Sequence, residues 1–205
     1  AVTLYHGDCR QIVPLLGRFD LLLTDPPYGI NGAIGGPNRN KGAYAGEWED
    51  SPAYIKTCVV PIIEACIQIC TGAAITPGNT NFGLYPQPDS FGCFYQPAAV
   101  GLQTHGNADS QPIFYYGKNP TRAHFGKPLS FILTEAPEKN GHPCVKPIRT
   151  WSKLLAAMSL EGMTVLDPFA GSGTTGRACK DLGRKCVMIE REEKYCEIAA
   201  RRMGQ

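Results

Sequence analysis

The sequence predicts an α/β fold with a doubly wound, mostly parallel β-sheet. Four short apolar runs, at 19–24, 72–76, 163–167 and 185–190, have the length and continuity of strands buried on both faces. Predicted helices lie between and after these runs, and strands that alternate with helices indicate an open parallel sheet. The length of 205 residues and the hydrophobic content of 43% allow one compact domain with a substantial core.

The composition is that of an ordinary globular protein. Charged residues make up 19% of the chain, which argues against wholesale disorder. The formal net charge of +2 neither indicates nor excludes a nucleic-acid partner, because a local basic face matters more than the sum. We expect residues 1–205 to form a single domain, within which 77–141 is a short insert or a reduced target-recognition region.

Cysteine and histidine usage predicts a reduced, metal-free protein. The nine cysteines are odd in number and include no CxxC pair, and Cys58, Cys66 and Cys70 share one apolar stretch. The four histidines form no ligand pair at metal-binding spacing. No apolar run reaches membrane-spanning length, and the first ten residues have no signal-peptide hydrophobic region. These observations predict a cytoplasmic location.

The first part of the chain contains one strand, one loop and one helix before the next strand. Residues 31–50 are rich in Gly and Asn without a period, which predicts a mobile loop. Ser51-Pro52 has the pattern of an N-cap and a first-turn proline, so a helix should run from there to about Cys70. Pro61 should kink or split that helix.

The rest of the chain divides into a poorly patterned region and a regular one. Many of the 17 prolines lie in 77–140, where we expect short strands and loops. Beyond it, the pattern predicts three helices. The first covers 148–160, the second begins at the glycine-rich residues 171–176 and ends near Gly183, and the third covers 192–203.

One glycine-rich motif follows a predicted strand and opens a predicted helix. It reads Asp167-Pro168-Phe169-Ala170-Gly171-Ser172-Gly173-Thr174-Thr175-Gly176. Its glycines let the backbone turn tightly and approach a ligand, and free amide groups at the helix start favour negative charge. Glu190 ends the next strand, where its side chain can accept hydrogen bonds from ribose hydroxyls. The combination favours a nucleoside site over a plain glycine turn with a solvated Glu.

Other nucleotide sites fit this motif less well. A nicotinamide dinucleotide site would need more chain after the motif for the usual full dinucleotide fold. A phosphate-binding P-loop would need a Lys directly after the glycines, and none is there.

A second motif, Asp25-Pro26-Pro27-Tyr28, follows the strand over 19–24. Two prolines after a strand-terminal Asp give a stiff backbone whose carbonyl groups a helix cannot use. Carboxylate and carbonyl oxygens can accept the N–H groups of a base amine, and the aromatic ring can stack on the base. The alternative is an ordinary proline turn.

With these motifs in this order, the sequence resembles the DNA adenine-N6 and cytosine-N4 amino-methyltransferases. Asp25 to Tyr28 looks like the family's catalytic motif, and Asp167 to Gly173 looks like its cofactor motif. The catalytic motif comes first here, which resembles the beta class; many RNA and protein amino-methyltransferases have the reverse order. Further resemblance lies in Gly7-Asp8-Cys9, in 142–147 and in 189–202. The resemblance is close over 4–30 and 142–203 and loose over 31–141.

The resemblance implies a Rossmann-like fold of the S-adenosylmethionine-dependent methyltransferase type and a role for each matching residue. The methyl donor would be S-adenosylmethionine, the product S-adenosylhomocysteine, and the catalytic residues Asp25, Pro26, Pro27 and Tyr28. The cofactor residues it implies are Asp8, Cys9, Asp25, Lys146, Asp167, Pro168, Phe169, Gly171, Ser172, Gly173, Thr174, Glu190 and Arg191.

DNA contacts are expected from basic residues in two regions. Arg39 and Lys41 lie in the predicted loop, although Glu47, Glu49 and Asp50 offset their charge. In the middle region, basic residues interleave with aromatic ones, a pattern that suits a DNA surface but also suits a core with a charged exterior. The residues concerned are Lys118, Arg122, His124 and Lys127, with Phe114, Tyr115, Tyr116 and Phe125.

The resulting hypothesis is direct transfer of a methyl group to a flipped base, with adenine N6 favoured because resemblance associates Asp at position 25 with adenine. Cytosine N4, an RNA or protein amine, and a non-catalytic DNA-binding role remain alternatives. The histidines receive no catalytic role, and Trp48 and Trp151 are expected in the core or an interface. The short middle region suggests that specificity comes from a homodimer or a separate partner. The DNA site and the biological purpose, including restriction-modification, stay open.

Overall fold

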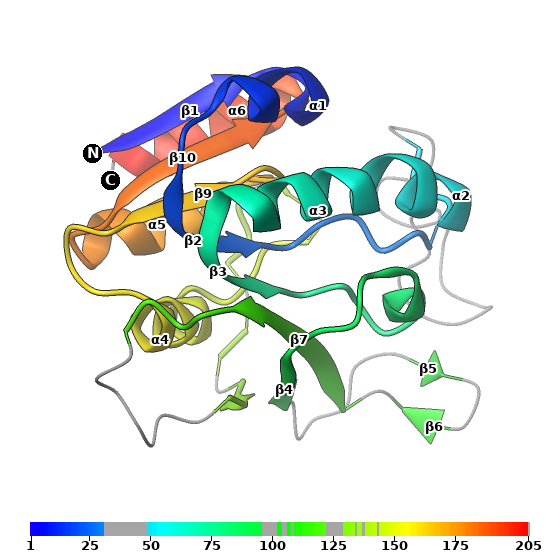
Figure 1. The fold of residues 1–205 in the computed structure, drawn as a ribbon. Coiled ribbons are helices and arrows are strands. Elements are labelled where there is room, and N and C mark those ends of the chain that lie inside the picture. The colour runs from blue at the N-terminus through cyan, green and yellow to red at the C-terminus, as the bar shows by residue number, and fades with distance from the viewer. Residues whose placement is uncertain are drawn as a thin grey trace.

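The computed structural model describes residues 1–30, 49–95, 102–103, 106–107, 109–121, 129–133, 135–136, 138–142 and 144–204. Its centre is an eight-stranded sheet in the order β1-β10-β9-β2-β3-β7-β4-β8 (Figure 1). The strands are β1 Val2–His6, β2 Phe19–Thr24, β3 Cys70–Ile75, β4 Ser90–Tyr95, β7 Ser110–Gly117, β8 Phe131–Ile132, β9 Thr164–Asp167 and β10 Lys185–Glu190.

The sheet has a parallel part and a mixed part. Strands β1, β10, β9, β2 and β3 are all parallel, whereas β7 runs antiparallel to both β3 and β4, and β8 pairs with β4 in parallel. The strands of the poorly patterned middle region therefore extend the main sheet. Leu102–Gln103 (β5) and Gly106–Asn107 (β6) form a separate two-stranded ladder.

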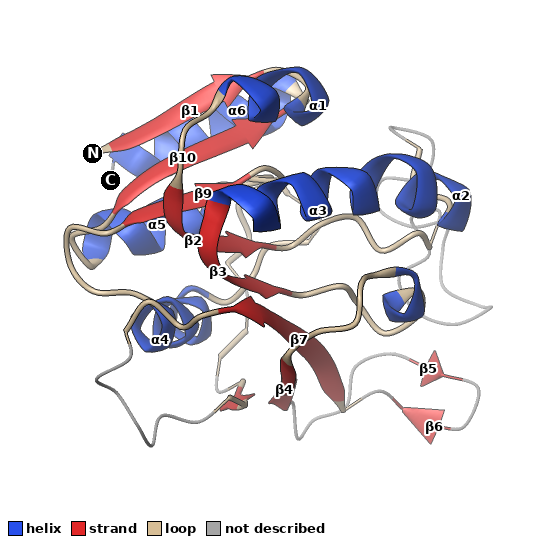
Figure 2. Cartoon of the chain, in the orientation of Figure 1, coloured by secondary structure: helices blue, strands red, loops and turns tan. Residues whose placement is uncertain are grey.

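Helices cover both faces of the sheet (Figure 2). One face carries α1 (Cys9–Ile12), the 3₁₀ turn Val13–Leu15 and α3 (Val60–Ile69); the other carries α4 (Ile148–Met158), α5 (Thr174–Asp181) and α6 (Glu193–Gly204). Successive residues of β2 alternate between the two cores, as the strand geometry requires. This two-sided coverage confirms the predicted doubly wound α/β class.

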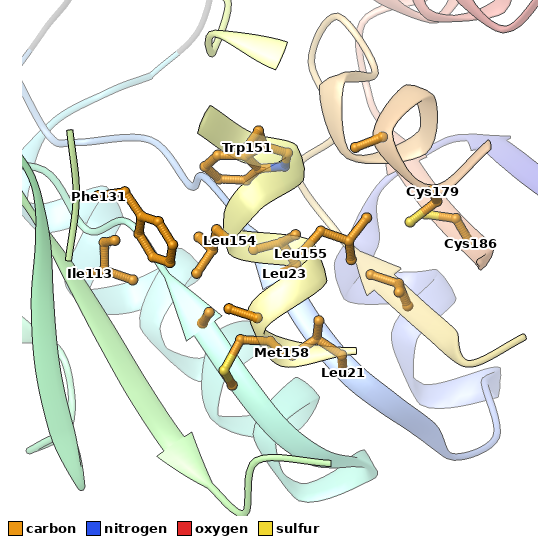
Figure 3. Packing of buried hydrophobic residues seen from close by; sticks show 14 of the residues in the cluster. Leu21, Leu23, Ile113, Phe131, Trp151, Leu154, Leu155, Met158, Cys179 and Cys186 are labelled. Atoms are coloured by element: carbon orange, nitrogen blue, oxygen red, sulfur yellow. The ribbon is translucent and has the colours of Figure 1, made fainter. Parts of the chain in front are cut away.

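One of the two cores of the described residues lies beneath α4 (Figure 3). Trp151, Leu154 and Leu155 of α4 are at most 2% exposed and pack against Leu21 and Leu23 of β2. The indole N–H of Trp151 donates to Thr175 Oγ1 at 3.0 Å, so the ring is satisfied as well as buried. The expectation that Trp151 is a core residue is confirmed.

The helix predicted from Ser51-Pro52 exists, and Pro61 changes it without splitting it. Ser51 Oγ accepts the N–H of Tyr54 at 3.1 Å and caps α2 (Pro52–Tyr54). A π-helical turn, Ile55–Val59, then leads into α3. A proline clashes with the carbonyl four residues before it, and the wider π turn directly precedes Pro61 and accommodates its ring.

The segment Pro52–Ile69 is also long and apolar enough to cross a membrane by length and composition. The expectation that no apolar run is long enough to span a membrane is therefore wrong by the criteria of length and composition. In the structure this segment packs one face on the sheet, through side chains that include Ile55, Val59 and Ile63. A helix of a two-layer core has the same composition, so the match is weak evidence for a membrane span.

Strands β2 and β9 lie side by side, and their connections leave in opposite directions. The chain after β2 crosses one face through α3 to reach β3, and the chain after β9 crosses the other face through α5 to reach β10. Ligands bind at such switch points, outside the carboxyl ends of the strands. The fold thus places the ends of the two predicted motifs next to each other.

Candidate active site

A cleft opens at the carboxyl ends of β1, β10, β9 and β2. It encloses about 1140 Å³ of space, including its open mouth. Most of the predicted site residues line it, and so do several residues for which no role was predicted. The lining comprises Gly7, Asp8, Cys9, Asp25, Pro26, Pro27, Tyr28, Asp50, Tyr54, His142, Cys144, Lys146, Trp151, Asp167, Pro168, Phe169, Ala170, Gly171, Ser172, Thr174, Thr175, Ile189, Glu190, Arg191, Glu192 and Tyr195.

Asp25 lines the cleft, and its carboxylate is held by three side chains. Its Oδ1 accepts the Tyr28 hydroxyl at 2.7 Å and the Thr76 hydroxyl, and its Oδ2 accepts Lys146 Nζ at 2.5 Å. Lys146 Nζ also donates to Tyr28 Oη at 2.8 Å. Burial raises the pKa of Tyr28 well above its usual value, so the phenol stays neutral and donates to Asp25.

The Tyr28 backbone and ring are fixed by residues from other segments. Asn81 Nδ2 donates to the carbonyl of Tyr28 at 2.7 Å, and Asp50 Oδ1 accepts the N–H of Gly29 at 2.6 Å. Gly78 has φ +76°, and a Cβ there would lie 2.6 Å from the Tyr28 ring. The ring therefore packs directly on the backbone of Gly78.

Asp50 corrects an expectation. The sequence suggested that its charge offsets basic residues in a solvated loop, but its side chain is buried, with the residue 2% exposed. Its two oxygens accept the N–H groups of Gly29 and Ile30, at 2.6 and 3.2 Å. Asp50 thus anchors the chain that follows Asp25-Pro26-Pro27-Tyr28.

Asp167 lies under the glycine-rich turn and is 3% exposed. Its oxygens accept the hydroxyls of Thr24 and Thr175, at 2.6 and 2.5 Å, and the N–H of Phe169 at 3.1 Å. These bonds tie the ends of β2 and β9 and the start of α5 together. Burial raises the pKa of the Asp167 carboxyl to about 6, although the hydrogen bonds oppose the rise.

The raised pKa of Asp167 predicts that its contribution to stability falls as pH rises. Between its usual pKa of 3.8 and the folded value of about 6, the folded state holds a proton that the unfolded state has lost. The free energy of unfolding should therefore decrease by up to about 3 kcal/mol from pH 4 to pH 6.5 through this group. Urea unfolding across this range should show that the Asp167→Asn variant lacks this decrease.

The comparison with a variant is necessary because His142 changes the free energy of unfolding with pH in the opposite direction from Asp167. Burial lowers the pKa of His142 from 6.5 to about 4, so its contribution to stability is lost as pH falls through that range. The difference between wild-type protein and Asp167→Asn isolates the carboxyl. A difference that is constant from pH 4 to pH 6.5 would refute the assignment.

Glu190, the last residue of β10, reaches the cleft next to the turn that follows β9. Glu190 Oε2 accepts the N–H of Gly171 at 2.7 Å, and its Oε1 accepts the N–H of Glu192 at 2.8 Å. Burial raises the pKa of Glu190. Gly171 has φ +50°, and a Cβ there would lie 3.0 Å from His142 Nε2. A carboxylate oxygen has a second lone pair, so each oxygen of Glu190 can still accept a ligand hydroxyl.

Gly173 is not among the residues that line the cleft, and the cofactor role implied for it stays a prediction. A Cβ at this position would point at α6, 2.9 Å from Ala199 Cβ and 3.1 Å from its Cα. Gly173 also has φ +75° and is the N-cap residue of α5. The residue allows α5 and α6 to approach each other.

The segment that follows β1 supplies a further part of the cleft wall, through Gly7, Asp8 and Cys9. The N–H of Gly7 donates to the carbonyl of Glu190 at 2.9 Å, which joins this wall to β10. Asp8 caps α1 through the N–H of Arg10, and the hydrogen-bonded Arg10 guanidinium lowers the pKa of Asp8. Burial raises the pKa of the Cys9 thiol to about 12, so this thiol is neutral in the wall.

His142 and Tyr195 form a part of the wall, and neither was assigned a role of its own from the sequence. The two rings meet edge to face with centroids 4.4 Å apart, and Tyr195 is 4% exposed. His142 Nδ1 accepts the N–H of Cys144 at 3.1 Å. The resemblance of 142–147 to a family segment was the only signal for His142, and a lone His in a sequence favours a packing role.

Among the expected DNA-surface residues, the four that the structure describes do not line the cleft. Phe114, Tyr115 and Tyr116 are core residues, between 5 and 8% exposed, so the interpretation of a basic aromatic surface is wrong for them. Lys118 is exposed and hydrogen-bonds to Thr71 at the amino end of β3, away from the cleft. Its contact with DNA stays a prediction without support from the site. Arg39, Lys41, Arg122, His124, Phe125 and Lys127 lie outside the described residues.

Comparison with known proteins gives the family. The model of the N6/N4 methyltransferase family, described as DNA methylase, matches residues 99–201, which is just over half of the chain. The chain belongs to this family of DNA methylases. The order of the motifs and the cleft that Asp25 shares with the glycine-rich turn agree with that membership, and S-adenosylmethionine is the methyl donor of the family.

The similarity of this DNA methylase to one relative and two solved structures covers nearly its whole length. The type II methyltransferase M.ScaI of Streptomyces caespitosus is 26% identical, with 98% of this chain and 81% of that protein covered. The crystal structure of the M1.HpyAVI–SAM complex has a TM-score of 0.72 at 20% identity, covering 100% of both chains. PvuII DNA methyltransferase, which is cytosine-N4-specific, has a TM-score of 0.69 at 12% identity, covering 98% and 86%. At these identities, the two structures establish the shared fold.

Proposed function

We propose that this protein methylates the N6 amino group of adenine in DNA, with S-adenosylmethionine as methyl donor. The observation that carries the proposal is that Asp25 and Tyr28 line the same cleft as Glu190 and the turn at Gly171. The first pair suits a base amine and the second suits a nucleoside, so one cleft has groups for both substrates of a methyl transfer.

The cleft residues fit S-adenosylmethionine. Glu190 and Asp8 provide carboxylates for hydroxyl and amine donors, and Phe169 and Ile189 provide apolar surface for a planar base. When bound, S-adenosylmethionine supplies a methyl group that its positively charged sulfur makes electrophilic. The chemical demand on the protein is then to activate and orient a weak nucleophile.

The catalytic motif meets that demand by accepting hydrogen bonds. The lone pair of an aryl amine is delocalised into its ring, and acceptors on its N–H groups favour a more tetrahedral nitrogen. Asp25 and Pro26 line the cleft, and the carboxylate and the Pro26 carbonyl would be such acceptors. Tyr28, held on Gly78, would stack on the extruded base and keep the nitrogen in line for attack. The same oxygens stabilise the positive charge that develops on nitrogen.

Adenine is proposed over cytosine because position 25 is Asp, which the family resemblance associates with adenine. Both amines make the same physical demands, and the PvuII fold likeness belongs to a cytosine-N4 enzyme. Nucleoside mass spectrometry of methylated DNA separates the two products. N4-methylcytosine would keep the mechanism and overturn the choice of base.

A substrate panel tests DNA against the other amine substrates. Wild-type protein with labelled S-adenosylmethionine should label unmethylated duplex DNA and leave RNA and total protein unlabelled. Label in RNA or protein alone would refute the DNA proposal, and S-adenosylmethionine binding without any product would support a non-catalytic role. A monomer that methylates a defined site unaided would also refute the hypothesis that specificity needs a dimer or a partner. A bacterial cytoplasm, where such DNA lies, is the proposed location.

A further inference from the structure

Lys146 contacts the catalytic motif directly. Its Nζ lies 2.5 Å from Asp25 Oδ2, 2.8 Å from Tyr28 Oη and 5.2 Å from the centre of the Tyr28 ring. The side chains of Lys146 and Asp25 are 14% and 19% exposed, so the pair is largely shielded from water. The family resemblance implied a cofactor role for Lys146, and these contacts suggest a different one.

We propose that Lys146 is a positioning residue for the methyl transfer, which acts through Asp25 and Tyr28 and does not determine affinity for S-adenosylmethionine. The inference rests on the proposed function. It assigns the ammonium group to the orientation of the nucleophile site, and it predicts that loss of Lys146 lowers the rate of the chemical step.

The hydrogen bonds around Asp25 show how this positioning works. Tyr28 and Thr76 both donate to Oδ1, and both would allow the carboxylate to swing about that oxygen. The bond from Lys146 to Oδ2 fixes the second oxygen and hence the plane of the carboxylate. An oxygen of a carboxylate has two lone pairs, so Oδ2 keeps one for the N–H of a base amine.

The hydroxyl of Tyr28 is fixed in the same way. It donates to Asp25 Oδ1 and accepts from Lys146 Nζ and from Gln111 Nε2, so its one donor and both acceptor sites are used. With the ring face packed on Gly78, the plane on which a base would stack is set at both the ring and the hydroxyl. Lys146 is the residue that bonds to both catalytic side chains.

The charge of Lys146 also belongs to this arrangement. A largely buried carboxylate without a partner is costly, and the ammonium group balances the charge of Asp25. The pair is neutral as a whole. The direction of the Asp25 lone pairs therefore matters more to the proposed transfer than the total charge of the pair.

The test compares Lys146→Ala and Lys146→Arg with Lys153→Ala, a change at an exposed lysine of α4 that follows in the same segment. Lys146→Ala should lower kcat by about 10²-fold, the scale of a misplaced reacting group, with the KM for DNA unchanged. Calorimetric titration should show wild-type affinity for S-adenosylmethionine. Added propylamine should restore part of kcat in Lys146→Ala, and Lys153→Ala should behave as wild type.

A second readout does not depend on activity. In protein with ¹³C-labelled tyrosine, Lys146→Ala should move the NMR signal of Tyr28, assigned from Tyr28→Phe, and leave the signals of distant tyrosines in place. If Lys146→Ala does not fold, Lys146→Arg decides: it keeps the charge but alters the geometry, so kcat should fall while cofactor affinity stays.

Two results would overturn the inference. Weakened S-adenosylmethionine binding with wild-type kcat at saturating cofactor would make Lys146 a cofactor ligand, and the proposed function would stand. An unmoved Tyr28 signal together with wild-type kcat would show that Lys146 positions nothing. A wild-type enzyme that labels no DNA would instead refute the proposed function, which is a separate outcome of the same assay.

Discussion

Replacing Asp25 by alanine is expected to abolish methyl transfer to DNA while S-adenosylmethionine still binds. The change removes the acceptor for the base amine and releases the bonds from Tyr28, Thr76 and Lys146. Loss of one preorganised polar group at a reacting centre costs about 10²–10³-fold in kcat, and Asp25 combines that role with the orientation of Tyr28. Initial rates with labelled donor, beside calorimetric titration of the donor, measure both quantities.

The fold of Asp25→Ala needs its own control, because Lys146 loses its carboxylate partner. We expect a loss of about 1–3 kcal/mol in the free energy of unfolding, as for a shielded charged group left without its hydrogen bond. The double variant Asp25→Ala, Lys146→Ala should regain part of that stability without regaining activity. Turnover by Asp25→Ala close to the wild-type rate would contradict the catalytic assignment.

The substitution Gly173→Asp should strongly destabilise the fold. The new side chain would be forced into a left-handed backbone conformation, at φ +75°, against Ala199 at 2.9 Å. Strain, overpacking and a buried carboxylate together should cost about 3–5 kcal/mol of the free energy of unfolding. Urea unfolding followed by circular dichroism measures this loss.

Gly162→Asp is the matched control for that change. Gly162 has φ +83° but is exposed and has nothing within 4 Å of an added Cβ. It should therefore show only the backbone strain, about 1 kcal/mol. If Gly173→Asp were as stable as Gly162→Asp and failed to bind S-adenosylmethionine, Gly173 would be a cleft residue and its placement against α6 would be wrong.

Strands that are buried on both faces could be predicted from the sequence. β2 occupies Phe19–Thr24 and β10 occupies Lys185–Glu190, as the continuous apolar runs indicated. β1, at Val2–His6, was not predicted, because it is an edge strand with a mixed burial pattern and with Tyr5 42% exposed. An edge strand of five residues gives neither a continuous run nor a clean alternation.

The site could be predicted where one segment holds a whole motif. Asp25 to Tyr28 and Asp167 to Ser172 line one cleft because parallel strands end at the same edge. The supporting residues could not be predicted, since Gln111, Asn81 and Asp50 reach the catalytic motif only through the tertiary fold. Asp50 was misinterpreted because it follows other acidic residues in a glycine-rich stretch, where a solvated charge is the usual case.

A sequence motif also does not show which neighbour a glycine faces in the fold. Gly171 and Gly173 are two residues apart, and both have positive φ. One faces His142 in the cleft wall and the other faces Ala199 of α6. The same pattern of glycines therefore lines the cleft at one position and allows helix packing at the next.

Mass spectrometry of nucleosides from methylated DNA tests the central claim most directly. Unmethylated duplex DNA is incubated with labelled S-adenosylmethionine and either wild-type protein or Asp25→Ala, then digested to nucleosides. The account predicts labelled N6-methyladenine from the wild-type protein and none from the variant. Labelled N6-methyladenine from both proteins would contradict the role of Asp25, and no methylated nucleoside from the wild-type protein, despite bound cofactor, would contradict the proposed function.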